Sequence, residues 1–305
     1  MSEPITISSV AQVHALMGQA APSHPHISVV GAAWHPPLRL TVPLADRKIH
    51  SDLYAVSLKR GDECWVAYGR QVHDAQAGTL LCLTPGQSFT PMAGEGGAAH
   101  TESAWTLVFH PDLVAGSPLA ARLRDFGYFR YTATEALHLH EGERQRLTDI
   151  VQALEREASA APDAHSKEVL VAHLELFFSY CGRFYTRQFH SRTQVQGGVL
   201  ARLQRHLDEY LSSARPREEG LPTVALCAKS LGYSPDYLSD LLREETGGSA
   251  RDHIHRALIE AAKRRLASTR ASVGEVAHSL GFEQPQHFSK LFKQKTGSSP
   301  GAWRG

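Results

Sequence analysis

The chain has 305 residues, of which 42% are hydrophobic and 21% charged, and its formal net charge is +1. This is the composition of an ordinary soluble globular protein, and the length predicts two domains. No apolar run approaches the roughly 20 residues that cross a bilayer. The N-terminus, MSEPITISSV, lacks the basic start and apolar core of a signal peptide. These features argue against a membrane-spanning or exported chain, and we expect a cytoplasmic location.

The small net charge hides a difference between the two ends of the chain. Residues 198–305 contain 16 Lys and Arg against 12 Asp and Glu, whereas the remainder contains 16 basic and 19 acidic side chains. A basic C-terminal part is typical of nucleic-acid-binding proteins, although a charge of this size is also common by chance. The four cysteines are scattered without a CxxC pair, so neither a zinc ribbon nor a disulfide framework is indicated.

Residues 27–109 have the pattern of strands and turns. Short apolar runs alternate with Pro, Gly and Asp clusters, and these runs are ISVVGAAW, SDLYAVSL, CWVAYGR, GTLLCL and AWTLVFH. Many short strands at this spacing are typical of a small all-β barrel or sandwich. We therefore expect a β domain within residues 1–140.

Residues 141–190 change to a helical period. The segment GERQRLTDIVQALERE predicts one helix, and a second is predicted from about Lys167 to Phe189 with a wide apolar stripe. The stripe consists of Leu170, Leu174, Phe177, Phe178, Cys181, Phe184 and Tyr185. It either packs under the β domain or meets a partner chain. We favour a homodimer interface formed by Leu170, Leu174, Phe177, Phe178 and Cys181.

The polar segment SRTQVQGG, residues 191–198, is predicted to be a linker, and helices are predicted after it. Two segments there are nearly the same, LGYSPDYLSDLLREETG and LGFEQPQHFSKLFKQKTG. Gly232 and Gly281 lie 49 residues apart, whereas Gly247 and Gly297 lie 50 apart, so one residue is inserted in the second turn. The segment that joins them, RDHIHRALIEAAKRRLAST, predicts a continuous helix of about four turns.

Each copy follows the pattern of a helix-turn-helix. A short helix ends at a glycine, which can adopt the left-handed backbone of a helix C-terminus. The aromatic residue that follows, Tyr233 or Phe282, can fill the corner between two helices. A proline, Pro235 or Pro285, then begins the next helix, where its missing N–H costs nothing. The alternative is a helical bundle with solvated polar faces, and the matched second copy makes it the weaker hypothesis.

The outer faces of the two second helices carry polar side chains of the kind that read base edges in the major groove. The candidate DNA contacts in the first copy are Ser234, Asp236, Tyr237, Ser239, Asp240 and Arg243. Those in the second copy are Gln284, Gln286, His287, Ser289, Lys290, Lys293 and Lys295. Two such helices on one rigid connector would reach successive major-groove segments, about 34 Å apart.

Residues from about Val199 to Trp303 resemble the DNA-binding domain of the AraC/XylS family of bacterial transcription regulators. The resemblance rests on the first repeat, on Ala262 and Lys263 of the connector, and on SVGEVAHSLGFEQPQHFSKLFKQKTGSSPGAWR, which ends with Gly297, Pro300 and Arg304 in the family's pattern. It covers about a third of the chain. Residues 1–190 resemble such regulators only in the order of strands followed by helices.

The resemblance implies an α+β multidomain protein. A cupin-like β-barrel would occupy residues 1–140 and dimerisation helices residues 141–190. An all-α domain with two helix-turn-helix units would occupy residues 199–305. The implied function is transcription regulation by sequence-specific binding of double-stranded promoter DNA. The expected partners are this DNA, a small-molecule effector in the barrel, RNA polymerase and a second copy of the chain. The alternative is a constitutive regulator whose barrel serves only as a dimerisation platform.

The two recognition helices differ in charge. The outer face of the first carries Asp236, Asp240, Arg243 and Glu244, whereas that of the second carries Lys290 and Lys293. Because phosphate attraction dominates affinity for DNA, we expect the second helix to contribute more of it. Asp240 could repel phosphate, accept a hydrogen bond from cytosine N4, or pair with Arg243 or Lys229. Between a direct contact and repulsion, we favour repulsion.

The 18 histidines raise the question of a metal-dependent enzyme. A metal-binding cupin needs a histidine after a Pro-x-Gly-like turn, but Gln87 follows Pro85 and Gly86. His24 and His26 lie in a Pro-rich approach, and His138 and His140 lie at a helix start. We therefore expect no metal, no cofactor, no catalytic residues and no enzymatic activity. The candidate effector-binding residues are Trp34, Trp65, Tyr68, Arg70, His73 and Trp105, of which Arg70 and His73 would suit an anionic effector.

Overall fold

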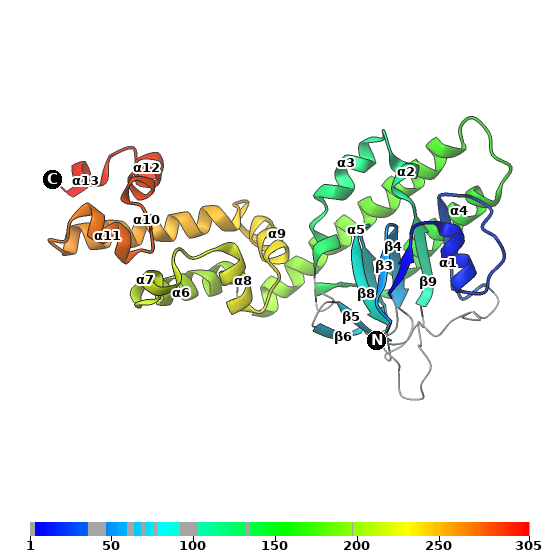
Figure 1. Ribbon diagram of the computed structural model, residues 1–305, viewed down its shortest axis with the longest axis horizontal. Coiled ribbons are helices and arrows are strands. Elements are labelled where there is room, and N and C mark those ends of the chain that lie inside the picture. The colour runs from blue at the N-terminus through cyan, green and yellow to red at the C-terminus, as the bar shows by residue number, and fades with distance from the viewer. Residues whose placement is uncertain are drawn as a thin grey trace. The chain divides into compact units, whose positions relative to one another are not determined.

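The structure is a computed structural model that describes residues 4–35, 47–59, 64–68, 71–75, 78–91, 103–131, 135–196 and 198–304. At residues 64–68, 71–75, 91, 103, 130 and 190–196 the description covers the backbone alone. The chain divides into two compact units, Met1–Gln188 and Phe189–Gly305 (Figure 1). None of the described helices is both long and apolar enough to cross a membrane.

The first unit contains two five-stranded sheets. One sheet has the order β1-β3-β8-β5-β6 and the other β10-β7-β4-β9-β2. Only the β1–β3 pairing is parallel among the described strands. The strands are β1 (Ile5–Ile7), β2 (Ile27–Val30), β3 (Ile49–Ser51), β4 (Tyr54–Lys59), β5 (Cys64–Tyr68), β6 (Gln71–Ala75), β7 (Thr79–Leu83), β8 (Gln87–Pro91), β9 (Ser103–Phe109) and β10 (Leu137–His138). Each of the five apolar runs predicted as strands overlaps one of these strands, which confirms that prediction.

A hydrophobic cluster joins the two sheets. Ile7 and Ile49 come from the first sheet, whereas Val30 and Val108 come from the second, and helix α1 (Val10–Leu16) adds Val10 to the same cluster. Among the described residues, the strand pairings form two separate sheets and no closed ring. This arrangement agrees with the sandwich alternative for the β domain, and a cupin-like barrel stays a prediction.

Two long helices follow the strands of the first unit, α4 (Glu141–Ser159) and α5 (Ser166–Gln196). The indole N–H of Trp105 in β9 donates to Thr148 of α4 at 2.9 Å, and its ring makes an edge contact with Phe177 of α5. Phe178 of α5 packs against Phe109 of β9. Shorter helices lie between β9 and β10, namely α2 (Pro111–Val114), α3 (Pro118–Asp125) and η1 (Gly127–Arg130).

These contacts correct the predicted dimer interface. All five of its residues, Leu170, Leu174, Phe177, Phe178 and Cys181, are fully buried within the single chain. The stripe is aromatic because it covers the β9 side of the sheet, so its width does not require a partner. The apolar side chains of α5 that do reach the surface are Val169, 37% exposed, and Leu176, 47% exposed.

The predicted linker at residues 191–198 is also wrong over most of its length. Helix α5 continues through Gln196, and the next helix, α6, begins at Val199 after Gly198 with a φ of 64°. The segment SRTQVQ contains no proline or glycine and includes good helix formers, so nothing in it stops a helix that is already growing. The polarity of this segment therefore did not indicate a break in the helix.

The second unit is built of helices around α10 (Ala250–Ser268), which lies centrally among its neighbours in Figure 1. The other helices are α6 (Val199–Ser212), α7 (Arg215–Glu219), α8 (Val224–Leu231), α9 (Pro235–Thr246), α11 (Val273–Ser279), α12 (Pro285–Thr296) and α13 (Pro300–Arg304). Helix α10 packs against α6, α8 and α9 and also against α11, α12 and α13. The predicted connector is therefore confirmed as one helix.

One arginine of α10 ties the ends of two other helices together. The guanidinium of Arg265 donates to the carbonyl oxygen of Leu211 at the end of α6 and, at 2.6 Å, to that of Ser279 at the end of α11. Burial lowers the pKa of Arg265, and Arg217 and Arg264 lower it further by repulsion. A cation in this position satisfies carbonyl groups that a helix C-terminus leaves without intrahelical partners.

Candidate nucleic-acid interface

The first helix-turn-helix comprises α8, a short turn and α9. Helix α8 ends at Gly232, whose φ of 77° lies in the left-handed region. The backbone N–H of Tyr233 then donates to the carbonyl oxygen of Ala228 at 2.8 Å, which closes the end of the helix. Ser234 caps α9 by accepting from the N–H of Tyr237, and Pro235 occupies the first helical position. The predicted helix end at Gly232 and the predicted helix start at Pro235 are confirmed, and Ser234 is the N-cap between them.

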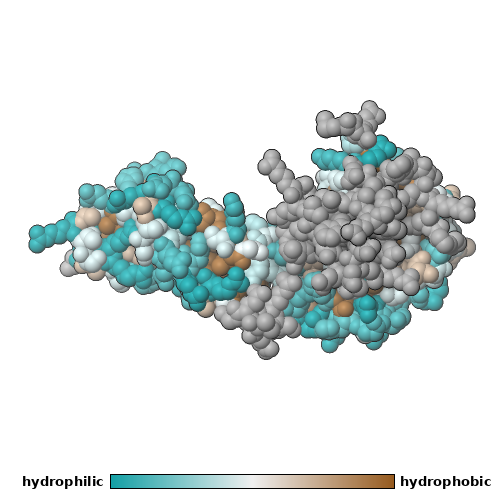
Figure 2. All heavy atoms as spheres, turned by 90° about the horizontal axis from the view of Figure 1, so that it is seen from below, coloured by the Kyte–Doolittle hydropathy of each residue, from teal (hydrophilic) through white to brown (hydrophobic). Residues whose placement is uncertain are grey.

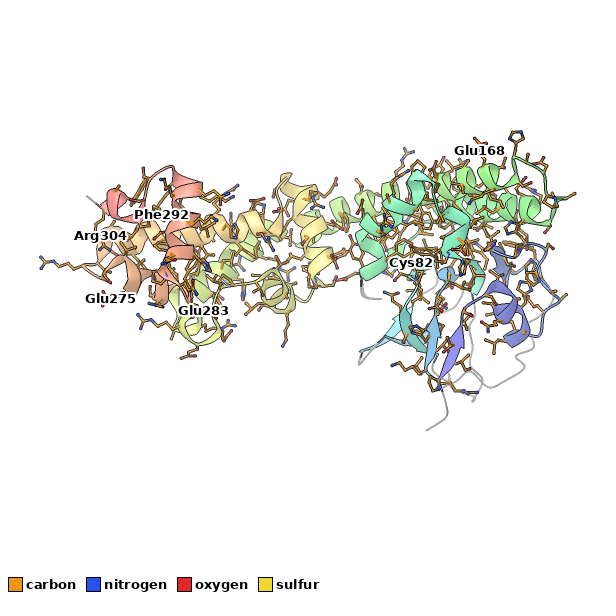
Figure 3. All side chains as sticks on the ribbon, turned by 45° about the horizontal axis from the view of Figure 1, so that its top comes forward. Cys82, Glu168, Glu275, Glu283, Phe292 and Arg304 are labelled. Carbon is orange, nitrogen blue, oxygen red and sulfur yellow. The ribbon has the colours of Figure 1, made fainter. Side chains whose placement is uncertain are left out.

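The second helix-turn-helix comprises α11, a turn with one more residue between its glycine and its proline than the first turn has, and α12. Gly281 has a φ of 92°, and a Cβ built on it would lie 2.6 Å from the carbonyl carbon and oxygen of Gly220. Gln284 precedes Pro285 without forming a side-chain cap. Phe288 and Phe292 are fully buried, and Leu291 is half-buried. Figure 3 labels Phe292 on α12 and Glu283 in the turn before it.

Tyr237 does not belong to the exposed face of α9, which corrects its place among the DNA contacts. Its side chain is 0% exposed. The ring packs edge-on against Phe189 of α5, with ring centroids 5.2 Å apart, and lies 5.5 Å from the ring of Tyr233. The position of Tyr237 two residues after the proline suggested an outward direction, but the end of α5 covers it.

The remaining polar side chains of α9 are largely engaged within their own helix. Asp240 accepts from the guanidinium of Arg243 at 3.0 Å, and the hydroxyl of Ser239 donates to the carbonyl oxygen of Pro235. The Asp240 side chain is 27% exposed and that of Arg243 is 62% exposed. The pairing of Asp240 with Arg243 that the sequence left open is present. This pair removes much of the attraction that Arg243 would offer to a phosphate.

The side chains of α12 that point outward are more exposed. Gln284, Gln286, His287, Lys290 and Lys293 are exposed, whereas Ser289 is half-buried. Within the described part of the chain, no ion pair joins Lys290 or Lys293 to an acidic residue. His287 occupies the position that corresponds to Tyr237, and it faces solvent. This face therefore offers uncompensated positive charge together with side chains that can form directed hydrogen bonds.

Lys295, the last candidate contact, is tied to α10. Its ammonium group lies 3.0 Å from a carboxylate oxygen of Asp252, whose other oxygen accepts from Ser249. The hydrogen bond from Ser249, followed by the interaction with Lys295, lowers the pKa of Asp252 to about 2. Lys295 thus fixes the end of α12 on α10, and we expect it to contribute less to DNA than Lys290 or Lys293.

Arg202 and Glu245 support the interface but were not identified from the sequence. The guanidinium of Arg202 in α6 stacks over the ring of Tyr233 and donates to its hydroxyl at 2.9 Å and to the carbonyl oxygen of Leu231. Glu245 of α9 accepts from the backbone N–H of Val199 at 2.9 Å. These partners lie 29 to 46 residues apart, so no local pattern could have indicated them.

The predicted effector residues separate into three groups. Trp105 is fully buried between β9, α4 and α5, so it belongs to the core and is removed from the candidate contacts. Trp34 is 38% exposed, and its indole N–H donates to Glu155 at 2.7 Å. Arg70 and the side chains of Trp65, Tyr68 and His73 lie outside the described residues.

A cavity of about 380 Å³ opens beside Trp34 in the first unit. It lies between the segment after α1, strand β2 and helix α4, and Leu154 and Ala158 contribute to its apolar wall. His35, held 2.5 Å from Glu155, contributes a polar side, as does His14, whose ring nitrogen lies 2.8 Å from the hydroxyl of Ser28. A small molecule with both apolar and hydrogen-bonding groups fits such a lining.

A family model described as a helix-turn-helix domain matches residues 227–305. The transcriptional activator NphR of Rhodococcus is 35% identical over 105 residues, which are 34% of this chain and 29% of that protein. The arabinose operon regulatory protein of Escherichia coli is 35% identical over 81 residues, 27% of this chain and 28% of that protein. The chain thus matches under a third of the length of either protein.

Solved structures show the same partial similarity. The C-terminal domain of AraT, a response regulator from Geobacillus stearothermophilus, is 28% identical, with a TM-score of 0.30, and the match covers 34% of this chain and 82% of that one. The DNA-binding domain of AdpA, solved in complex with a target DNA, is 26% identical, with a TM-score of 0.29, over 34% of this chain and 88% of that one.

Proposed function

We propose, on the premise that the C-terminal part of this chain is a helix-turn-helix domain of the AraC/XylS type, that the protein is a sequence-specific DNA-binding transcription regulator. The observation that carries the proposal is the exposed face of α12, where Lys290 and Lys293 stand beside Gln286 and His287. Lysines neutralise phosphates, and glutamine or histidine side chains can read base edges. Figure 2 shows a mainly hydrophilic surface over the second unit, broken by a few hydrophobic patches.

We propose that the two recognition helices, α9 and α12, contribute unequally to the affinity for DNA. Helix α12 would supply most of the electrostatic affinity, whereas α9, with its Asp240–Arg243 pair, would add little. Helix α10 has 19 residues and so a length of about 28 Å, which is comparable to one turn of B-DNA. A connector of this length allows α9 and α12 to enter successive segments of the major groove.

The proposal is tested by measuring binding of the full chain to labelled duplex DNA over a range of salt concentrations. Fluorescence anisotropy should show an affinity that falls steeply with salt, with a logarithmic slope that counts the phosphates neutralised. The Lys290→Ala/Lys293→Ala variant should lower that slope by about two, because it removes two such contacts. The matched control is Arg264→Ala, an exposed cation of α10 placed 3.5 Å from Asp208. A salt-independent affinity, or the same slope for the wild type and the double variant, would remove α12 from the interface.

We further propose that a small-molecule effector binds in the cavity beside Trp34. Its volume, its apolar wall and its His35–Glu155 pair support this proposal. The alternative, a constitutive regulator without a ligand, predicts that no compound raises the unfolding midpoint of the protein. A ligand that binds only the folded state must raise it. A thermal-shift screen with Ala158→Trp as a cavity-filling control separates the two, because a true cavity ligand should lose its effect in that variant.

Homodimerisation and contact with RNA polymerase remain proposals. The exposed apolar side chains of α5 that could form a dimer interface are Val169 and Leu176. They lie seven residues apart and therefore on one face of the helix. Leu176→Glu should convert a dimer into a folded monomer in sedimentation velocity. Leu174→Glu, by contrast, should unfold the first unit, because Leu174 is fully buried.

A further inference from the structure

Two histidines and an aspartate meet at one end of the second sheet in the first unit. His26 immediately precedes β2, His110 immediately follows β9, and Asp112 lies in α2. The antiparallel pairing of β2 with β9 sets Ile27 opposite Phe109, so the two histidines that flank these residues are also brought together. The backbone N–H of His110 donates to the carbonyl oxygen of His26 at 2.8 Å. One ligand atom from each of the three residues lies within 4.8 Å of the other two.

A third imidazole borders the group. The ring of His24 lies 6.0 Å from that of His26, and the ring of His26 lies 5.7 Å from that of His110. Protonated imidazoles this close repel each other, whereas neutral imidazoles with available nitrogen lone pairs are metal ligands.

Hydrogen bonding within the group explains only part of the arrangement. One ring nitrogen of His110, Nδ1, faces the backbone N–H of Asp112 at 3.2 Å and its carboxylate at 3.3 Å. The Nδ1 atom of His24 accepts from the backbone N–H of His26 at 3.1 Å. No hydrogen bond joins the half-buried His26 ring to another residue in the described part of the chain. The central ring of the cluster is therefore the one that lacks such a structural role.

We propose that His26, His110 and Asp112, with His24 as a fourth donor, form a binding site for a divalent transition-metal ion such as Zn²⁺. Imidazole and carboxylate are a ligand set that suits Zn²⁺, Co²⁺ and Ni²⁺, and four ligands complete a tetrahedron. Zinc–ligand bonds of about 2.0–2.1 Å place neighbouring ligand atoms about 3.3 Å apart, so the side chains must draw together on binding. Asp112 has the freedom to move, since its side chain is 68% exposed.

The proposed site has a regulatory position. His24 is also part of the wall of the 380 Å³ cavity, so an ion held by His24 and His26 would fix the segment that forms one side of that cavity. The metal would thereby join the segment before β2 to the chain after β9, which the sequence separates by more than 80 residues. This inference does not depend on the proposed DNA-binding function, and a failure of either leaves the other standing.

The test uses Co²⁺ as a spectroscopic probe on the full-length protein without a polyhistidine tag. A tetrahedral site should give intense visible d–d absorption that saturates at one equivalent and disappears when Zn²⁺ is added. In His26→Ala/His110→Asn the band should be lost and the Kd for Zn²⁺ should rise roughly tenfold or more. Asparagine at position 110 keeps an N-cap acceptor for α2 while removing the imidazole. The matched control is His165→Ala, because the His165 side chain is 80% exposed and distant in sequence.

A second readout protects the test against loss of folding. Zn²⁺ should raise the thermal unfolding midpoint of the wild type and of His165→Ala, but not that of the double variant, and Mg²⁺ should raise none of them. Circular dichroism without metal checks that the variants are folded. Asp112→Asn, at an exposed position, should weaken Co²⁺ binding without affecting the fold. The proposal is overturned by the absence of a tetrahedral Co²⁺ band, by equal Zn²⁺ affinity in the wild type and the double variant, or by unchanged affinity in Asp112→Asn.

Discussion

The two helix-turn-helix copies share an interior and differ in their exteriors. Both end their first helix near a left-handed glycine, begin the second with a proline, and close it at a left-handed glycine, Gly247 or Gly297. The second residue after the proline differs in direction between the copies. In the first copy Tyr237 is buried against Phe189, whereas in the second His287 is exposed to solvent. The first pairs its acid and base on one face, and the second leaves two lysines without an acidic partner among the described residues.

A repeated fold therefore does not require a repeated function. The positions that set the turn and the core are constrained by backbone conformation and by burial in both copies. The outer positions are constrained only by what touches them, and in the first copy that is α5 as well as solvent. Four sets of variants test this difference between the two copies.

The strongest test exchanges alanine for the corresponding residues Tyr237 and His287. Tyr237→Ala should lower the free energy of unfolding by about 3–5 kcal/mol, because it empties a buried aromatic position. His287→Ala should change stability by less than about 0.5 kcal/mol and should weaken cognate DNA binding by roughly 1–3 kcal/mol. Urea denaturation and DNA anisotropy measure both variants. Similar losses of stability in the two variants would mean that the copies do not differ in this way.

The two turn glycines provide the second test. Gly232→Ala should cost about 1 kcal/mol, since it strains a left-handed residue that has nothing within 4 Å of the added Cβ. Gly281→Ala should cost about 3 kcal/mol, because its Cβ would also overlap the backbone of Gly220. Equilibrium unfolding in urea gives both values. If the two substitutions proved equally mild, the close approach of Gly281 to Gly220 would be wrong.

The third test concerns charge on the recognition helices. Lys293→Ala should weaken binding to all sequences alike, by about 1 kcal/mol, and lower the salt slope by about one. Asp240→Asn should strengthen binding to every sequence by a similar or smaller amount, because it releases Arg243 and removes a negative charge. Selection from a randomised site library at fixed salt gives the comparison. Weaker cognate binding by Asp240→Asn, with a relaxed preference at one C·G pair, would show instead that Asp240 reads cytosine.

The fourth and smallest effect is the pH dependence of stability that arises from the segment after the second helix of each copy. In the first copy, Thr246 shares a hydrogen bond of 2.8 Å with His253, whose pKa is lowered mainly by burial and further by Arg256. The folded state binds a proton at His253 less tightly than the unfolded state does. The contribution of neutral His253 to stability is therefore complete above pH 6.5 and is lost as pH falls below that value. The corresponding residue of the second copy, Trp303, does not titrate.

The measurement for this fourth prediction is urea denaturation as a function of pH. His253→Asn should make the acid-induced loss of stability shallower, although His206 and His255, whose pKa values are also lowered by burial, retain part of it. Trp303→Phe serves as the control and should leave the pH profile unchanged in shape. An unchanged profile in His253→Asn would show that this histidine is equally protonated in the folded and unfolded chains.

The sequence predicted the second unit well because its signals are local. Gly232, Ser234 and Pro235 act within four consecutive residues, and the stripe of Ile254, Leu258 and Leu266 follows one helix. The AraC/XylS-type identity of the C-terminal part is confirmed by the match over residues 227–305. The end of α5 was predicted too early, because the polar residues 191–196 were interpreted as a linker although they continue the helix.

What the sequence could not supply was contact between distant segments. Helical spacing showed that Phe177 and Phe178 share a stripe, but not whether a sheet of the same chain or a second chain covers it. The burial of Tyr237 could not be predicted for the same reason, because it depends on the position of Phe189. The proximity of His26 to His110 likewise depends on the pairing of β2 with β9. Amphipathic patterns identify a face to be buried and leave open what buries it.

Arg265 and Gly281 both connect the first helix-turn-helix half of the second unit to the second half, and this affects how the unit unfolds. Arg265 connects the ends of α6 and α11, and Gly281 lies against the backbone after α7, so elements of the first half are held to elements of the second. Neither copy can therefore lose its structure without exposing buried groups of the other. The repeat is visible in the sequence, but residues 199–304 should melt as one cooperative unit, with amide hydrogens of α9 and α12 exchanging through the same global opening.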